Sequence, residues 1–95
     1  MDVTGEIIVW RGPAPFHLVR LPAAPAAEVA DLSRDVSYGW GMVPVDAELG
    51  ATRWSTSLWP KDGGYLLPVK DAVRRAEAVD AGDVVTVRML IRPRR

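Results

Sequence analysis

One pattern of segments occurs twice in this chain, and it constrains the fold more than any other feature. In each copy an apolar strand ends in Leu-Pro, a short helical segment and a glycine follow, and an alternating strand closes the unit, over residues 16–49 and again over residues 65–91. The corresponding positions are Leu21-Pro22 with Leu67-Pro68, and Gly41 with Gly82. Neither copy can bury its apolar face alone, so two copies related by a pseudo-twofold axis would share one core. Chance repetition of a β-α-β pattern is the alternative.

The spacing of apolar residues predicts six strands and two short helices. We expect strands over residues 3–11, 16–21, 42–49, 52–59, 65–67 and 84–91, and helices from about residue 25 to 36 and from 70 to 78. The first strand is apolar on both faces, which is typical of a strand that is covered on both sides or closes a barrel. Pro60 to Gly64 is expected to be a turn. Closing such short strands into a barrel removes the exposed edges that they would otherwise present.

Composition sets the limits for the class of protein. The chain has 95 residues, enough for one domain over residues 1–95, and its twelve Lys and Arg residues balance twelve Asp and Glu residues. A nucleic-acid-binding domain normally has a basic excess, so this balance disfavours such a partner. The absence of cysteine excludes disulfides and thiolate metal sites. With no apolar run of membrane-spanning length and no signal-peptide pattern, we expect a cytoplasmic protein.

Several segments together resemble a known family. They are residues 16–22, 54–60, 64–70, 73–76 and 82–87, with the sequences FHLVRLP, WSTSLWP, GYLLPVK, VRRA and GDVVTV. In these segments the chain resembles the bacterial Domain of Unknown Function family nineteen-oh-five, and the likeness covers nearly the whole chain. The resemblance implies a double-split β-barrel, a fold shared with the AbrB and MazE group of transcription factors and antitoxins, in which two chains build one barrel. The family has no established activity, so the resemblance supplies a fold and no catalytic residues.

The fold expected from both arguments is mainly β. It is a six-stranded double-split β-barrel with two short helices and a pseudo-twofold internal duplication. Six strands in so short a chain predict a barrel filled with side chains, so a ligand would lie at an end or on the rim.

The candidate binding residues centre on a basic helix face. Lys70 and Arg74 are four residues apart on one face of the second helix, close to its start, where anions are favoured. With Arg53 and Tyr65 from neighbouring strands, they could hold a carboxylate or phosphate through charge-assisted hydrogen bonds. The alternative is a solvated face on which these cations pair with acids such as Asp71.

Four tryptophans in 95 residues are also unusual. Trp54 alternates with apolar neighbours and is expected in the core. Trp10 and Trp59 fall on the outer faces of their strands, where tryptophan often marks a contact surface. Trp40 lies between two glycines in a loop, and it could close over a pocket mouth as a lid or plug one end of the barrel.

Other chemistry has weak support in the sequence. A lone histidine, His17, cannot supply a metal site of the usual multi-ligand kind, so no metal is expected. We expect no other cofactor either. Ser55 and Ser57 lack the strand-to-helix elbow of a serine nucleophile. Lys70 could act as an amine catalyst only if it were buried.

Three functions follow from these features. The first is a non-enzymatic ligand-binding or interaction module with an anion-tolerant rim site near Lys70, Arg74, Tyr65 and Trp40. It would bind a small anionic ligand and exist as a monomer or weak homodimer without contact to a membrane. The second is a DNA-binding regulator or antitoxin like AbrB or MazE. The third is a small enzyme that uses Lys70.

Overall fold

Six strands and two helices follow one another in the computed structural model, which describes residues 1–12, 15–36 and 41–92. The strands are β1 (Asp2–Trp10), β2 (Phe16–Arg20), β3 (Val43–Leu49), β4 (Thr52–Lys61), β5 (Gly64–Pro68) and β6 (Val84–Ile91), and the helices are α1 (Ala23–Val36) and α2 (Asp71–Glu77). All eight segments agree with the sequence prediction in type and order, and β6 also agrees at both ends.

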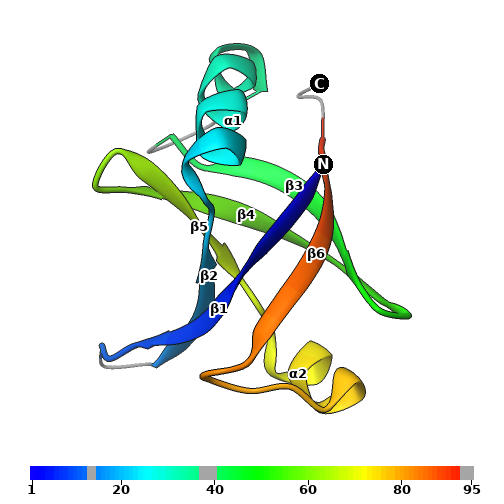
Figure 1. Ribbon diagram of the computed structural model, residues 1–95. Coiled ribbons are helices and arrows are strands. Elements are labelled where there is room, and N and C mark those ends of the chain that lie inside the picture. Colours follow the sequence, from blue (N-terminus) through cyan, green and yellow to red (C-terminus); the bar gives the residue numbers. More distant parts are fainter. Residues whose placement is uncertain (13–14, 37–40, 93–95) are drawn as a thin grey trace.

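The strands close into an antiparallel barrel in the order β1-β2-β5-β4-β3-β6 (Figure 1). The strand that completes the ring is β1, because it pairs with β6 through Asp2–Glu6 and with β2 through Ile7–Trp10. The first strand, apolar on both faces, was expected either to be covered on both sides or to close a barrel. The structure confirms the second expectation.

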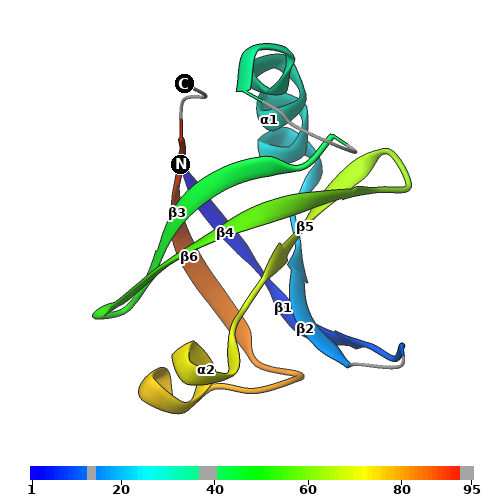
Figure 2. The same ribbon diagram turned by 180° about the vertical axis from the view of Figure 1, so that it is seen from behind.

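The topology has the symmetry that the repeated pattern predicts. Exchanging β1, β2 and β3 with β4, β5 and β6 leaves the ring order unchanged. The two longest strands correspond in this exchange, and each divides its pairing between two neighbours: β4 pairs with β3 as far as Leu58 and with β5 from Trp59. The helices correspond too, and they lie at opposite ends of the barrel in both views (Figures 1 and 2).

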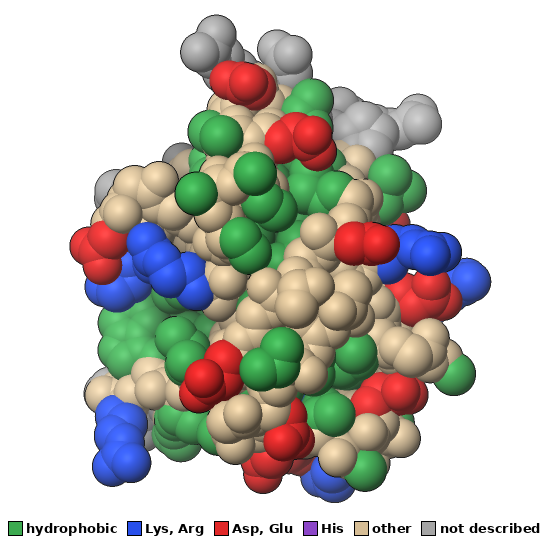
Figure 3. Space-filling model, in the orientation of Figure 1, with side chains coloured by type: hydrophobic (Ala, Val, Ile, Leu, Met, Phe, Trp, Pro, Cys, Tyr) green, Lys and Arg blue, Asp and Glu red, His purple; other side chains and the backbone are tan. Residues whose placement is uncertain are grey.

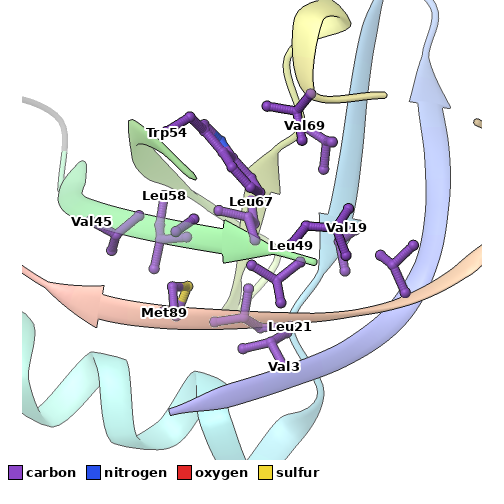
Figure 4. Packing of buried hydrophobic residues seen from close by; sticks show 14 of the residues in the cluster. Val3, Val19, Leu21, Val45, Leu49, Trp54, Leu58, Leu67, Val69 and Met89 are labelled. Atoms are coloured by element: carbon purple, nitrogen blue, oxygen red, sulfur yellow. The ribbon is translucent and has the colours of Figure 1, made fainter. Parts of the chain in front are cut away.

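The barrel interior is filled by side chains from all six strands (Figure 4). Alternate residues of β3 and β6 point inward as predicted, and Trp54 is buried among them. The labelled members of this core are Val3, Val19, Leu21, Val45, Leu49, Trp54, Leu58, Leu67, Val69 and Met89. Binding therefore has to take place at the barrel ends or on the outer surface.

The turn predicted over Pro60 to Gly64 is shorter than expected. Pro60 and Lys61 belong to β4, where they pair with Tyr65 and Gly64, and only Asp62 and Gly63 form the turn. Because β4 pairs with β3 only as far as Leu58, one side of the strand beyond that residue has no ladder hydrogen bonds, so a proline can be accommodated there.

Both helices bury fewer apolar residues than their helical spacing would allow. In α2, Val73 is buried but Ala76 is exposed, and in α1, Val29 is buried while Leu32 remains exposed. Each helix lies across a barrel end, so only the residues nearest the opening are covered.

Candidate functional site

The candidate site begins where two neighbouring strands of the barrel separate. The pairing of β4 with β5 stops at Trp59 and Leu66, and beyond that point β5 continues only alongside β2, where Pro68 pairs with Leu18. Inside the barrel Trp54 crosses this opening, since its indole nitrogen Nε1 donates a hydrogen bond of 3.1 Å to the carbonyl oxygen of Pro68. The opening is thus closed from the inside and remains a groove on the outside.

This groove has a volume of about 530 Å³, and we call it the Lys70 groove. It is lined by Pro15, Phe16, His17, Thr56, Trp59, Pro68, Val69, Lys70, Asp71 and Arg74. Residues from β2, β4, the end of β5 and the start of α2 therefore meet at one place on the barrel surface.

One wall of the Lys70 groove is aromatic. Phe16 and Trp59 pack edge to face, with ring centroids 4.9 Å apart and planes at 78°. Trp59 makes a second edge contact with Trp10, at 5.9 Å and 70°. Trp10 and Trp59 were predicted to lie on outer faces, and the structure confirms this position and brings the two rings together.

The lining contributed by the start of α2 is cationic, and Arg74 organises it. Its Nη1 donates to the carbonyl oxygen of Val69 at 2.9 Å, and its Nη2 donates to Asp71 Oδ1 at 3.1 Å. These bonds join Arg74 to the residues on both sides of Lys70, to the backbone of Val69 and to the side chain of Asp71, so Arg74 fixes the segment that presents the lysine.

Lys70 has its ammonium group available. The side chain is exposed, and no residue that the structure describes forms a hydrogen bond or ion pair with it. Asp71, the nearest acid along the chain, is already paired with Arg74 and Arg75. A positive charge without an internal partner at a groove wall can attract an anionic group.

His17 also lines the groove, and the sequence arguments gave it no role. Its Nε2 lies 3.1 Å from Asp80 Oδ1, and the same oxygen is 3.7 Å from Nε of Arg74. The sequence does indicate where His17 lies: it alternates with Val19 and Leu21, so it is on the inward-facing side of β2. The contact between Phe16 and Trp59 could not be predicted from the sequence, since it depends on which strands pair.

The structure separates the predicted site residues. Lys70 and Arg74 line the same groove, whereas Arg53 lines a second groove of about 500 Å³ and pairs with Glu48 at 3.0 Å. Tyr65 is not among the described residues that line the Lys70 groove. The hydroxyl of Tyr65 is 3.4 Å from Oγ of Ser33 in α1, and Trp40 lies outside the described residues.

The described part of the chain contains neither a metal-binding group of side chains nor a membrane-spanning helix. No group of three or more acidic or histidine side chains there could hold a metal ion. No helix within residues 1–12, 15–36 and 41–92 is both long and apolar enough to span a membrane.

The chain matches the model of a known protein family. The model of a family described as Domain of unknown function (DUF1905) matches residues 4–89. No curated protein matches the chain.

Proposed function

The chain belongs to the DUF1905 family of domains of unknown function, and from this premise we propose that it is a non-enzymatic binding module. Its ligand is a small molecule with a flat apolar part and an anionic group. The binding site is the Lys70 groove.

The observation that carries this proposal is that an available cation and two partly exposed aromatic rings line the same groove. Ligand sites are usually concave and mostly apolar, with a few polar groups that fix the orientation of the ligand. In the Lys70 groove, Phe16 and Trp59 provide the apolar wall and Lys70 provides the charge. A flat apolar group would lie against the rings while its acid group reaches the ammonium.

The second groove lacks this combination. Its two cations are already engaged: Arg53 pairs with Glu48 at 3.0 Å, and Arg88 lies 3.8 Å from Asp2. An anion that bound there would have to compete with carboxylates held by the fold.

Neither alternative function gains comparable support. For a DNA-binding face formed by the arginines of α2 and of the carboxy-terminal segment, Arg75 is already paired with Asp71, and Arg92 lies 3.8 Å from Asp46. They also lie at opposite ends of the barrel, on α2 and just after β6 (Figure 1). For the enzyme alternative, Lys70 is exposed, so it lacks the burial that an amine catalyst requires.

A thermal-shift panel tests the proposal. The panel contains benzoate, indole-3-acetate and phenyl phosphate, with acetate, inorganic phosphate and phenol as compounds that carry only one of the two groups. A ligand at about 100 times its Kd stabilises a domain by about 2.7 kcal/mol, which raises Tm by roughly 10 °C or more at this size. We expect at least one two-part compound to raise Tm and the one-part compounds to have much smaller effects.

Two variants locate the binding. Lys70→Met removes the ammonium group and should abolish most of the shift, whereas Arg53→Met, in the second groove, should leave it unchanged. The proposal fails if no two-part compound raises Tm, or if the shift survives in Lys70→Met.

A further inference from the structure

A second apolar layer lies outside the barrel, on the half built by the end of β1, β2, β5 and the end of β4. Leu18 and Leu66 alternate with core residues of their strands and point outward, and neither belongs to the internal core. Yet they are only 0% and 3% exposed. Other outward side chains of these strands must therefore cover them, and we call this surface the hairpin face. Its outward apolar residues are Ile8, Trp10, Phe16, Leu18, Trp59 and Leu66.

The covering side chains are themselves left open to solvent. Ile8 is 41% exposed, Trp10 is 44% exposed and Phe16 is 45% exposed. They are contiguous, because Trp10 pairs with Phe16 and Ile8 lies two residues before Trp10 on the same strand. Figure 3 shows hydrophobic side chains gathered over the β1–β2 and β4–β5 hairpins, with basic side chains above and below them. A contiguous exposed apolar patch of this kind usually marks an interaction surface.

Two cations lie on the hairpin face. Lys61 places its Nζ 4.9 Å from the centre of the Trp10 ring, and Arg20 donates from Nη2 to the carbonyl oxygens of Lys61 and Asp62 at 3.4 and 3.3 Å. Among the residues that the structure describes, neither cation has a carboxylate partner. The positions of this face on β2, β4 and β5 carry no Asp or Glu, and the nearest acids along the chain are Asp62, in the β4–β5 turn beside Lys61, and Glu6, two residues before Ile8.

The other half of the barrel surface is different. Asp2, Asp46 and Glu48 occupy outward positions there, and each lies within 4 Å of an arginine. The cations without acidic partners and the exposed aromatic rings therefore coincide on the hairpin face.

We propose that the hairpin face docks an acidic segment of another protein. Apolar side chains of that segment pack on Ile8, Trp10 and Phe16, while its carboxylates reach Lys61 and Arg20. Charge complementarity favours this partner, since Arg20 and Lys61 lie beside the exposed apolar residues and pair with no described carboxylate.

Two other occupants fit less well. A second copy of the chain, docked through the same face, would bring the Arg20 and Lys61 of both copies together, with only Asp62 beside them along the chain to offset four positive charges. Single-stranded nucleic acid needs open ring faces on which successive bases stack. Here the rings meet edge to face at 70° and 78°, Lys61 lies over the ring of Trp10, and part of the exposed surface is aliphatic.

Selection from a random library of twelve-residue peptides, displayed on phage and captured by the purified protein, tests this inference. We expect the selected peptides to be enriched in Asp and Glu next to Trp, Phe or Leu. Synthetic copies should bind Trp10→Ser and Lys61→Glu at least about tenfold more weakly than they bind the unmodified chain. Leu90→Ser is the matched control, because Leu90 is an exposed apolar residue on the outer face of β6, and it should bind as the unmodified chain does.

The outcomes separate this inference from the proposed function. Phe16 and Trp59 belong to both surfaces, whereas Lys70 belongs to the Lys70 groove alone. Lys70→Met should therefore bind the peptides normally even where it has lost the small ligand. The inference is overturned if the selected peptides show no acidic enrichment, or if Trp10→Ser and Leu90→Ser bind them equally. Two further results would overturn it. One is that the unmodified chain binds a labelled oligothymidine and Trp10→Ser does not; the other is that sedimentation shows a concentration-dependent dimer of the unmodified chain that Trp10→Ser abolishes.

Discussion

Trp54 shows how one residue can hold together two strands that do not pair. It is buried on β4, and its indole nitrogen satisfies the carbonyl oxygen of Pro68 at the point where β5 has left β4. A buried carbonyl oxygen without a partner costs free energy, so the indole both fills the core and stabilises the opening above which the Lys70 groove lies. Its burial could be predicted from the alternation of β4, but its hydrogen bond could not, because the acceptor is 14 residues away on another strand.

Replacing Trp54 with phenylalanine tests this role. Trp54→Phe keeps an aromatic ring in the core but removes the N–H donor, and we expect the free energy of unfolding to fall by about 1–3 kcal/mol. Urea denaturation measures the change. Trp10→Phe, an exposed exchange of the same two residue types, should change stability by less than about 0.5 kcal/mol. Equal effects of the two substitutions would contradict the assigned role.

At the scale of the elements, the sequence predicts where strands and helices lie better than it predicts which neighbours they pair with or pack against. The alternation of Val85, Val87, Met89 and Ile91 defines β6 at both ends, because one face of that strand is buried along its whole length. Pro60 was assigned to a turn, since nothing local reveals that β3 stops pairing before it. Helical spacing likewise indicates a helix but not how much of it the barrel end covers, which is why α2 buries Val73 and leaves Ala76 exposed.

The attachment of α2 can be tested at its single buried residue. Val73→Ala removes two methyl groups from the contact between α2 and the barrel, and we expect it to lower the free energy of unfolding by about 1–3 kcal/mol. Ala76→Ser, on the exposed side of the same helix, should change it by less than about 0.5 kcal/mol. Urea denaturation of both variants provides the comparison, and a destabilisation by Ala76→Ser as large as that by Val73→Ala would show that the helix packs differently.

At the scale of the whole molecule, a balanced net charge conceals an uneven surface. One half of the barrel pairs its outward acids with arginines, while the other half combines exposed aromatic rings with Lys70, Lys61 and Arg20, none of which has a carboxylate partner among the described residues. Composition could not reveal this division, because it counts charges without locating them. The candidate site was predictable only in part for the same reason: Lys70 and Arg74 are close in sequence, whereas Arg53 and Tyr65 could be placed only once the strand pairing was known.

The central claim is that the Lys70 groove is the binding site, and an NMR titration of the isotope-labelled protein with indole-3-acetate and phenyl phosphate tests it most directly. We predict saturable shifts at the Trp59 indole, at His17 and at the backbone amides of Val69 and Lys70, with the signals of Arg53 and Arg88 unchanged. No shift with either compound up to about 1 mM, a concentration at which even weak specific binding is visible, would contradict the claim. Shifts confined to the groove lined by Arg53 and Arg88 would contradict it as well.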